Sequence, residues 1–257
     1  MFPQFFTLCA ILLLTACTAV PDSPVASEDS INANAWAKQP LQQQPSPPSD
    51  QAATAVWQHY PLPGKQATVF SYARLDGRDT MTAQAQASAS MLRQSVHVPP
   101  ADLGQVRFSW KVSELLAQAD MALRDADDSP VRVVLAFEGD RSQFSAKNAM
   151  LSELSQALTG EPLPYATLMY VWCNTREPGT VIVNPRTDRI RKLVVASGSS
   201  QLDIWQDYER DIRADYEKVF GEPPGALVAV GIMTDADNTR STAQAWYGPI
   251  RLVSEGR

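Results

Sequence analysis

The sequence predicts a mainly β protein, an antiparallel β-sandwich of jelly-roll type with one or two packed amphipathic helices. Three observations carry this prediction. Short apolar runs typical of strands recur along the chain, and many are bounded by Gly, Pro or Asp. Two further segments have helical character. The helical segments do not alternate with the strands, as the helices of parallel βαβ units would.

The first predicted strands flank LDGRD, where a Gly in the turn favours a hairpin. The later ones are VRFSWKV, VRVVLAFEGD, YATLMYVW, GTVIV, RIRKLVVASG, ALVAVGIMTD and AQAWYGPIRLV. Trp110 and Trp172 lie in apolar runs and are predicted to belong to the core. Cys173 follows MYVW and is predicted to be a buried structural thiol, because burial makes thiols inert.

Two segments have the composition and spacing of helices. The first is AKNAMLSELSQAL, in which four apolar residues share one face: Met150, Leu151, Leu154 and Leu158. The second is IWQDYERDIRADYEKVFG, whose opposite face is charged and whose apolar residues recur at helical spacing: Ile204, Tyr208, Ile212, Tyr216, Val219 and Phe220. Gly221, with two prolines just beyond it, predicts the end of this helix.

Residues 1–16 have the features of a signal peptide, because their apolar run is too short to remain as a membrane span. Its end, Leu14-Thr15-Ala16-Cys17, resembles the bacterial lipobox. That resemblance implies cleavage before Cys17 and lipidation of Cys17 by diacylglycerol and a fatty acid such as palmitate. Several acyl chains on one residue are enough for stable anchoring. The alternative is an ordinary secretory signal with a chance cysteine.

Residue 18 is Thr rather than Asp, which resembles lipoproteins sorted to the outer membrane. We therefore expect a lipid-anchored envelope protein on the periplasmic face of that membrane. Residues 17–54 are predicted to be the lipidated cysteine and a flexible tether, because Pro, Gln, Ser and Ala dominate and large apolar residues are few. Residues 55–257 are predicted to form one domain, long enough for a substantial core.

Charge and motifs exclude several function classes. The net charge is −6 without a basic stripe, so nucleic acid is not expected as a partner. The chain lacks the G-x-S-x-G, H-E-x-x-H, P-loop and dinucleotide motifs. Its two histidines, His59 and His97, are predicted to be solvated surface residues. No catalytic residue is predicted, although glycoside hydrolysis stays open because two carboxylates can suffice, and the acids nearest strand ends are Asp128, Glu138, Asp140 and Asp235.

Two acidic segments are candidates for a metal site. TDADNT offers Asp235, Asp237 and Asn238, and RDADDSP offers Asp127 and Asp128. Hard oxygen ligands of this kind suit calcium, and two clusters lying together at one edge of the sandwich could share an ion. The alternatives are a structural turn, since Asp and Asn bond to their own backbone at strand ends, or direct polar contact with a ligand.

Exposed aromatic side chains are the second kind of candidate, because jelly rolls often present aromatic faces to sugar rings beside a few polar groups. Each could equally be core or rim packing. The candidates for ligand binding are Trp57, Tyr60, Trp205, Trp246 and Tyr247.

Several segments together resemble one family: DDSPVRVVLAFEGD, LPYATLMYVW, IRKLVVASGSSQLDIW, ADYEKVFGEPPGALVAVGIMTDADNT and AWYGPIRL. In this order they resemble the bacterial domain of unknown function 3047, from about Trp57 to Val253. The resemblance implies exported bacterial proteins with a jelly-roll-like sandwich and no established activity. Pro249 departs from the pattern, because an acidic residue would be expected before the final strand.

The sequence thus predicts an envelope lipoprotein whose sandwich binds a ligand, an envelope glycan or a protein partner, without catalysing a reaction. The alternative is a carboxylate-based or metal-assisted hydrolase of envelope polysaccharide. A purely structural envelope component is a third possibility.

Overall fold

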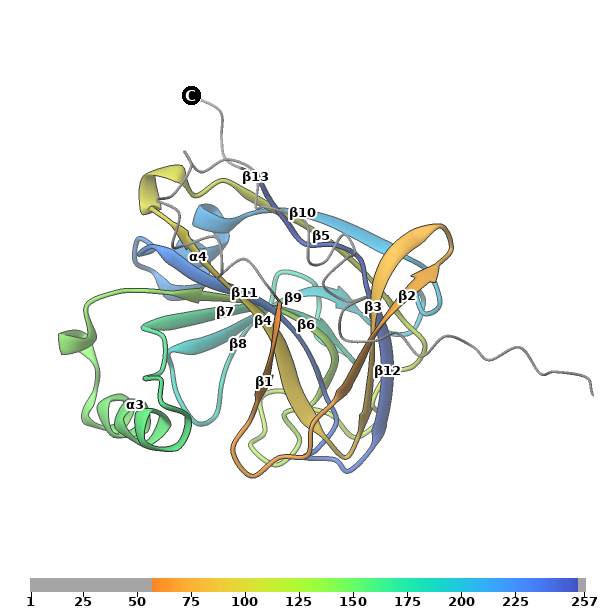
Figure 1. The fold of residues 1–257 in the computed structure, drawn as a ribbon, viewed down its shortest axis with the longest axis horizontal. Helices are drawn as coiled ribbons and strands as arrows, with labels where there is room; N and C mark the ends of the chain where they lie inside the picture. The colour runs from red at the N-terminus through yellow and green to blue at the C-terminus, as the bar shows by residue number, and fades with distance from the viewer. Residues whose placement is uncertain (1–56, 254–257) are drawn as a thin grey trace, which may run out of the picture.

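The computed structural model describes residues 57–253, so the predicted signal peptide, Cys17 and the predicted tether lie outside the described residues. Two β-sheets face each other in this part of the chain (Figure 1). The seven-stranded sheet has the order β1 (Gln58–Pro61), β4 (Ala89–Val98), β11 (Leu227–Asp235), β6 (Ser129–Phe137), β7 (Ala166–Cys173), β9 (Ile190–Ser197) and β8 (Val181–Val183).

The six-stranded sheet has the order β10 (Gln206–Asp211), β5 (Gln105–Val112), β12 (Thr242–Tyr247), β3 (Arg78–Gln86) and β2 (Val69–Leu75), and β13 (Arg251–Val253) also pairs with β5. The helices are α3 (Ala146–Thr159), α4 (Ile212–Phe220) and the short 3-10 turns η2 (Pro100–Asp102) and η3 (Arg141–Gln143). Within residues 57–253 the strand pairs are antiparallel, except that β7 and β9 are parallel. The predicted β-sandwich with two helices is confirmed.

The core lies between the two sheets. Alternate residues of β5 and β6 point into it, including Phe108, Trp110 and Phe137, and Trp172 of β7 joins them. Strands β6 and β7 are buried along their whole length, because a second apolar cluster around Met121 and Met169 covers the outer face of the seven-stranded sheet. The core positions predicted for Trp110, Trp172 and Cys173 are confirmed.

The β2–β3 hairpin turns where the sequence predicts it. Asp76 and Gly77 both have positive φ, at 52° and 77°, which is the conformation that two-residue hairpin turns with right-handed strand twist require. Two other features were not predicted. β1 is a strand, and Gly248 and Pro249 divide the last apolar run into β12 and β13.

The second predicted helix is wrong in its first half. Residues 206–211 form β10, which pairs with β5, and α4 begins only at Ile212. Half-buried and exposed residues alternate along QDYERD, as they do in a strand. Tyr208 points inward against Phe108, and its charged neighbours point outward. Asp211 then caps α4 by accepting a hydrogen bond from the Ala214 backbone N–H at 2.9 Å. The apolar residues of this segment fit both the two-residue period of a strand and the 3.6-residue period of a helix. Its hydrogen bonds to β5 make residues 206–211 a strand.

The first predicted helix exists as α3, but its apolar side faces outward. Met150, Leu154 and Leu158 are 60%, 52% and 61% exposed, whereas Asn148 and Ser152 are its buried residues. Among the helices of residues 57–253, none combines the length and the hydropathy needed to cross a bilayer.

Candidate functional site

The two acidic segments predicted to share a site do lie together. Asp128, immediately before β6, accepts hydrogen bonds from the backbone N–H groups of Asn238 and Thr239 at 3.2 and 2.7 Å. The side chains of the same two residues donate at 2.9 and 2.6 Å. Burial raises the pKa of Asp128, but the hydrogen bonds from Thr239 and Asn238 outweigh it and hold this pKa below its usual range. Asp128 therefore fixes the turn that follows β11.

Asp127 makes a different set of contacts, with two buried cations. The Nζ of Lys192, on β9, lies 2.7 Å from each carboxylate oxygen of Asp127 and also donates to the Met121 carbonyl at 2.9 Å. Arg132, on β6, donates to the Asp127 carbonyl at 2.8 Å and to its carboxylate at 3.2 Å. Burial, aided by the charge of Arg132, lowers the pKa of Lys192 to about 8. This pair ties the segment before β6 onto the outer face of the seven-stranded sheet.

Asp235, the last residue of β11, has one engaged and one free oxygen. Arg132 Nη2 donates to Oδ2 at 3.0 Å, and Oδ1 is buried without a hydrogen-bond partner in residues 57–253. Burial raises the pKa of Asp235 well above its usual value, against the lowering effect of Arg132. Carboxylate oxygens of Asp128, Asp235 and Asp237 lie within 4.8 Å of one another. A protonated Asp235 could donate a hydrogen bond from its carboxyl O–H to the carboxylate of Asp128 or Asp237.

A calcium ion needs six to eight oxygen ligands, and the oxygens of this cluster are largely engaged by the protein itself. Both oxygens of Asp128 already accept two hydrogen bonds each. Asp237 forms an ion pair with Lys65, and the guanidinium of Arg132 lies beside Asp235. This leaves Asp235 Oδ1 as the unpartnered buried carboxylate oxygen in the described part of the chain. The geometry favours the structural-turn interpretation, and a calcium titration is the direct test of the ion hypothesis.

The five aromatic candidates do not form one surface. Tyr247 is 1% exposed, and its hydroxyl donates to the Met233 carbonyl at 2.6 Å, so it is a core residue with no face for a sugar. Trp57 packs against the main core, and Tyr60 carries the guanidinium of Arg93 over its ring at 4.3 Å. The alternation of β12 that buries Tyr247 turns Trp246 to the outer face of the six-stranded sheet.

Trp205 and Trp246 are joined through a charged pair on that outer face. The indole N–H of Trp205 donates to Asp76 at 3.0 Å, and Lys111 forms a salt bridge with the same carboxylate at 3.1 Å. Lys111 also lies 5.9 Å from the centre of the Trp246 ring. Both tryptophans are half-buried, with polar partners already in place.

A groove of about 590 Å³ lies where strand ends of the seven-stranded sheet approach β10, an edge strand of the six-stranded sheet. It is formed by the end of β7, the end of β9 and the start of β10. Its polar lining comes from Asn174, Thr175, Glu177, Ser197, Ser200, Gln201 and Gln206. Half-buried Tyr208 supplies aromatic surface to the groove, whereas Trp172 is 1% exposed and belongs to the core. This volume lies within the range of about 300 to 1,000 Å³ that small-ligand sites occupy.

A bulge in β9 shapes one wall of the groove. Val194 pairs with Val171 and Ala196 pairs with Trp172, so Val195 is an extra residue in the register. Val195, Ala196 and Ser197 all line the groove. Bulges of this kind re-aim side chains and recur beside binding sites. Sequence reasoning missed the groove, because neither a bulge nor the meeting of two sheet edges has a signature in the residues themselves.

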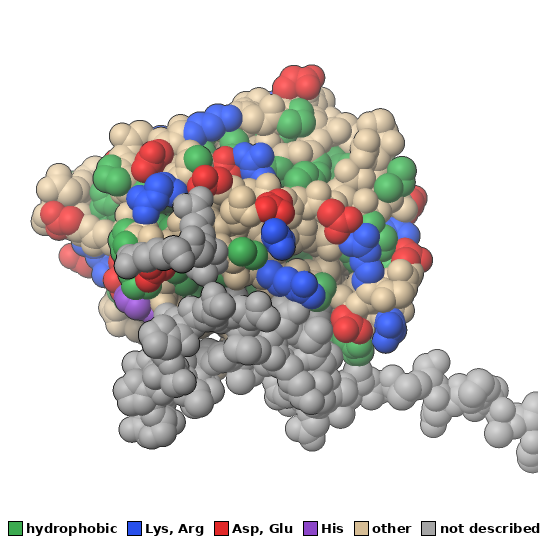
Figure 2. Space-filling view, turned by 90° about the horizontal axis from the view of Figure 1, so that it is seen from above, with side chains coloured by type: hydrophobic (Ala, Val, Ile, Leu, Met, Phe, Trp, Pro, Cys, Tyr) green, Lys and Arg blue, Asp and Glu red, His purple; other side chains and the backbone are tan. Residues whose placement is uncertain are grey.

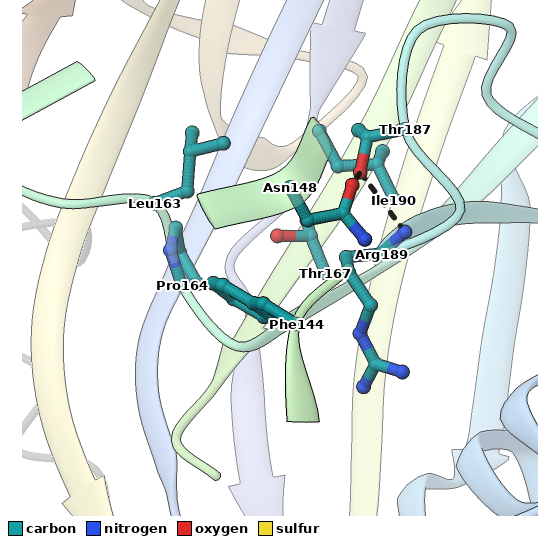
Figure 3. A pocket seen from close by; sticks show the side chains of 8 residues that line it. All are labelled: Phe144, Asn148, Leu163, Pro164, Thr167, Thr187, Arg189 and Ile190. Atoms are coloured by element: carbon teal, nitrogen blue, oxygen red, sulfur yellow. Dashed lines mark hydrogen bonds between the residues drawn. The ribbon is translucent and has the colours of Figure 1, made fainter. Parts of the chain in front are cut away.

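A second cavity is far smaller, at about 10 Å³, and lies between α3 and the seven-stranded sheet. Figure 3 shows Asn148 of α3 pointing toward Thr187, whose hydroxyl donates to it at 2.8 Å. Room for about one water molecule makes this a packing feature rather than a ligand site.

Three solved structures align with most of the chain at low identity and low TM-score. The xyloglucanase domain of NopAA, a type three effector from Sinorhizobium fredii in complex with cellobiose, is 8% identical over 77% of this chain and 93% of that one, with a TM-score of 0.39. An endo-1,4-β-glucanase, CelB2, is 9% identical over 74% and 100%, with a TM-score of 0.37. The family 11 xylanase from Neocallimastix patriciarum is 9% identical over 78% and 100%, with a TM-score of 0.33. The likeness is one of fold alone.

No curated protein matches the chain in sequence. A family model does match, over residues 55–251, and its description is "Protein of unknown function (DUF3047)". The match includes both sheets, the buried ion pairs and the groove. The chain belongs to the DUF3047 family.

Proposed function

We propose that this protein is an envelope lipoprotein whose β-sandwich binds a neutral, hydroxyl-rich glycan in the groove between β7, β9 and β10. The observation that carries the proposal is the lining of the groove. Six of its seven polar side chains are uncharged amides or hydroxyls, which can both donate and accept hydrogen bonds. Such groups match sugar hydroxyls, and Tyr208 adds aromatic surface against which a ring can pack.

The same lining favours binding over hydrolysis. Glycosidases use two carboxyl groups, about 5 to 9.5 Å apart, on either side of the scissile bond. Among the residues that line this groove, Glu177 is the one carboxylic acid. The other acids near strand ends lie elsewhere, because Asp128 and Asp235 belong to the buried cluster and Glu138 and Asp140 lie on an exposed loop.

Charge on the surface supports an uncharged ligand. On the face that Figure 2 shows, acidic and basic side chains are intermingled rather than gathered into a single-sign patch. In the described part of the chain several charged side chains form ion pairs between strands, as Arg78 does with Asp207 and Arg107 with Glu209. A partner recognised by long-range charge would need a larger field of one sign.

Lipid anchoring at Cys17 and location at the periplasmic face of the outer membrane belong to the same proposal. They rest on the Leu14-Thr15-Ala16-Cys17 resemblance to the lipobox and on Thr18. A bacterial envelope offers glycan within reach of such an anchor.

The experiment is co-sedimentation of the Cys17→Ser chain with purified insoluble cell-wall glycan. Ser200, an exposed residue of the groove lining, is changed to Trp to fill the groove. The matched control is Ser199→Trp, also at an exposed position of the same turn but outside the lining. We expect the parent chain and Ser199→Trp to sediment with the glycan and Ser200→Trp to remain in solution. Equal sedimentation of all three would contradict binding in the groove.

A further inference from the structure

The helix α3 presents three of its four large apolar residues to solvent and buries two polar residues, Asn148 and Ser152, against the protein. Met150, Leu154 and Leu158 recur at four-residue spacing and form a stripe on the outside of the helix, each more than half exposed. On the opposite side Asn148 donates to Asp188 at 2.6 Å and accepts from Thr187 at 2.8 Å, as Figure 3 shows for Thr187. This is the reverse of the arrangement that buries an amphipathic helix in a core.

The helix is well formed, so the exposed stripe is not a fraying end. Ser145 caps its first turn by accepting from the Asn148 backbone N–H at 3.2 Å. Gly160 ends it in the left-handed conformation, with φ of 80°. Large apolar side chains held at this exposure on an ordered helix mark a contact surface.

The chain enters the domain on the same flank as the C-terminal end of α3. Arg93 of β4 forms a bidentate ion pair with Glu161, just beyond the helix, with distances of 2.7 and 2.9 Å. The same guanidinium lies over the ring of Tyr60 in β1, the first strand of the described chain. One side chain therefore links the segment that follows α3 to the strand at which the predicted tether arrives.

The length of that tether keeps the flank near the lipid surface. Residues 17–56 separate the proposed acylated cysteine from the domain. For a flexible chain of this length, as its composition predicts, the root-mean-square end-to-end distance is about 35 Å. A domain of this size is itself about 40 Å across. The tether therefore keeps the domain within about one domain diameter of the bilayer. The resulting effective concentration of α3 at the membrane surface allows even a weak apolar contact to form much of the time.

We propose that the Met150–Leu154–Leu158 stripe of α3 docks into the headgroup region of the membrane in which the protein is anchored. The inference rests on the lipid anchor included in the proposed function. Amphipathic helices with a narrow apolar face lie in the plane of the interface in this way. Docking would fix the orientation of the sandwich relative to the bilayer, where a flexible tether alone leaves it free to turn.

The test uses the full mature protein, acylated and reconstituted in vesicles of phosphatidylethanolamine and phosphatidylglycerol. An environment-sensitive fluorophore is attached to the new thiol of Leu154→Cys. It labels this thiol alone, because Cys17 is acylated and Cys173 is buried. The matched control is Gln156→Cys, an exposed residue about 200° around the same helix. We expect blue-shifted emission at position 154, quenched by brominated lipid, and neither effect at position 156.

A companion variant, Met150→Ser with Leu158→Ser, keeps the label at position 154 and removes its apolar neighbours. We expect it to lose most of the quenching. A protein that floats with the vesicles while position 154 remains unquenched would overturn the docking and leave the anchor intact. A blue shift without lipid quenching would show that a second copy of the chain covers the stripe instead, and would also overturn it. Failure to float with the vesicles would overturn the anchor and the docking together.

Discussion

Lys192 and Asp127 form a buried ion pair in which the ammonium nitrogen lies 2.7 Å from each carboxylate oxygen. Lys192 is 0% exposed, and its third contact is the Met121 carbonyl at 2.9 Å. All three donors of the ammonium are thus satisfied without water. The pair links β9 to the long segment before β6, which covers the outer face of the seven-stranded sheet.

Removal of one partner of this pair should be strongly destabilising. Lys192→Met leaves Asp127 buried with Arg132 as its remaining cation and Asn184 as a neutral donor, and breaking a buried pair in this way costs about 3 to 5 kcal/mol. Arg107→Ala is the matched control, because its ion pair with Glu209 is about half exposed and such pairs contribute about 0 to 1 kcal/mol. Urea unfolding of both variants measures the difference. Equal losses of stability would refute the structural role of the pair.

The raised pKa of Asp235 predicts how the stability of the protein changes with pH. Burial raises its pKa in the folded protein above the 3.8 of a free carboxyl group. From about pH 4 upward the folded state therefore keeps a proton that the unfolded state releases, and the stability contributed by Asp235 falls as pH rises. The free energy of unfolding of the native protein, minus that of Asp235→Asn, should therefore decrease as pH rises above about 4, for as long as only the unfolded state is ionised.

The same comparison with Asp207→Asn is the control, because Asp207 is exposed on β10. A difference that increases with pH for Asp235 would mean an ionised carboxylate paired with Arg132, and would contradict a protonated Asp235 in the folded state.

Calcium should leave the thermal unfolding of the protein unchanged, because protein donors occupy the oxygens of Asp128, Lys65 pairs with Asp237, and the cation Arg132 lies beside Asp235. The midpoint of unfolding is compared in calcium chloride and in EDTA. Calcium bound at a hundredfold excess over its dissociation constant would add about 2.7 kcal/mol, a shift of several degrees. A rise of that size, abolished in Asp235→Ala, would make the cluster an ion site.

Lipidation at Cys17 is tested in cells with an alkyne analogue of palmitate. The native chain should incorporate the analogue and fractionate with membranes, and Cys17→Ser should do neither. Incorporation at the same level in both would leave the signal peptide as an ordinary secretory one.

Much of the fold could be predicted from local sequence, but the parts that depend on tertiary partners could not. Apolar runs bounded by turn residues located most strands, and Gly77 located a hairpin. QDYERD fits both periodicities, and only its pairing with β5 makes it a strand. The stripe of α3 is apolar whichever way it points, so the sequence alone predicted a packed face where the structure has an exposed one.

The candidate sites show the same division. Turn chemistry singled out Asp127, Asp128, Asp235, Asp237 and Asn238, since Asp and Asn gather at strand ends, and the fold brings these two segments together. Their cationic partners were missed, because Arg132 is a single charge in an apolar strand, Lys192 follows Arg191 at the start of β9, and nothing local marks either one as buried. Tyr247 was wrongly predicted to bind a ligand. It and Trp246 are adjacent aromatic residues of β12, and nothing in the local sequence shows which of the two faces the core.

Binding in the groove is tested most directly by mapping it with nuclear magnetic resonance. Soluble glycan strands from the cell wall are titrated into the isotopically labelled Cys17→Ser chain, and backbone amide shifts are followed. Glycan binding between β7, β9 and β10 predicts saturable shifts confined to residues 172–178, 195–201 and 206–208, absent in Ser200→Trp and kept in Ser199→Trp. Shifts centred on Trp205 and Trp246 at the outer sheet face, or no shifts at all, would contradict it.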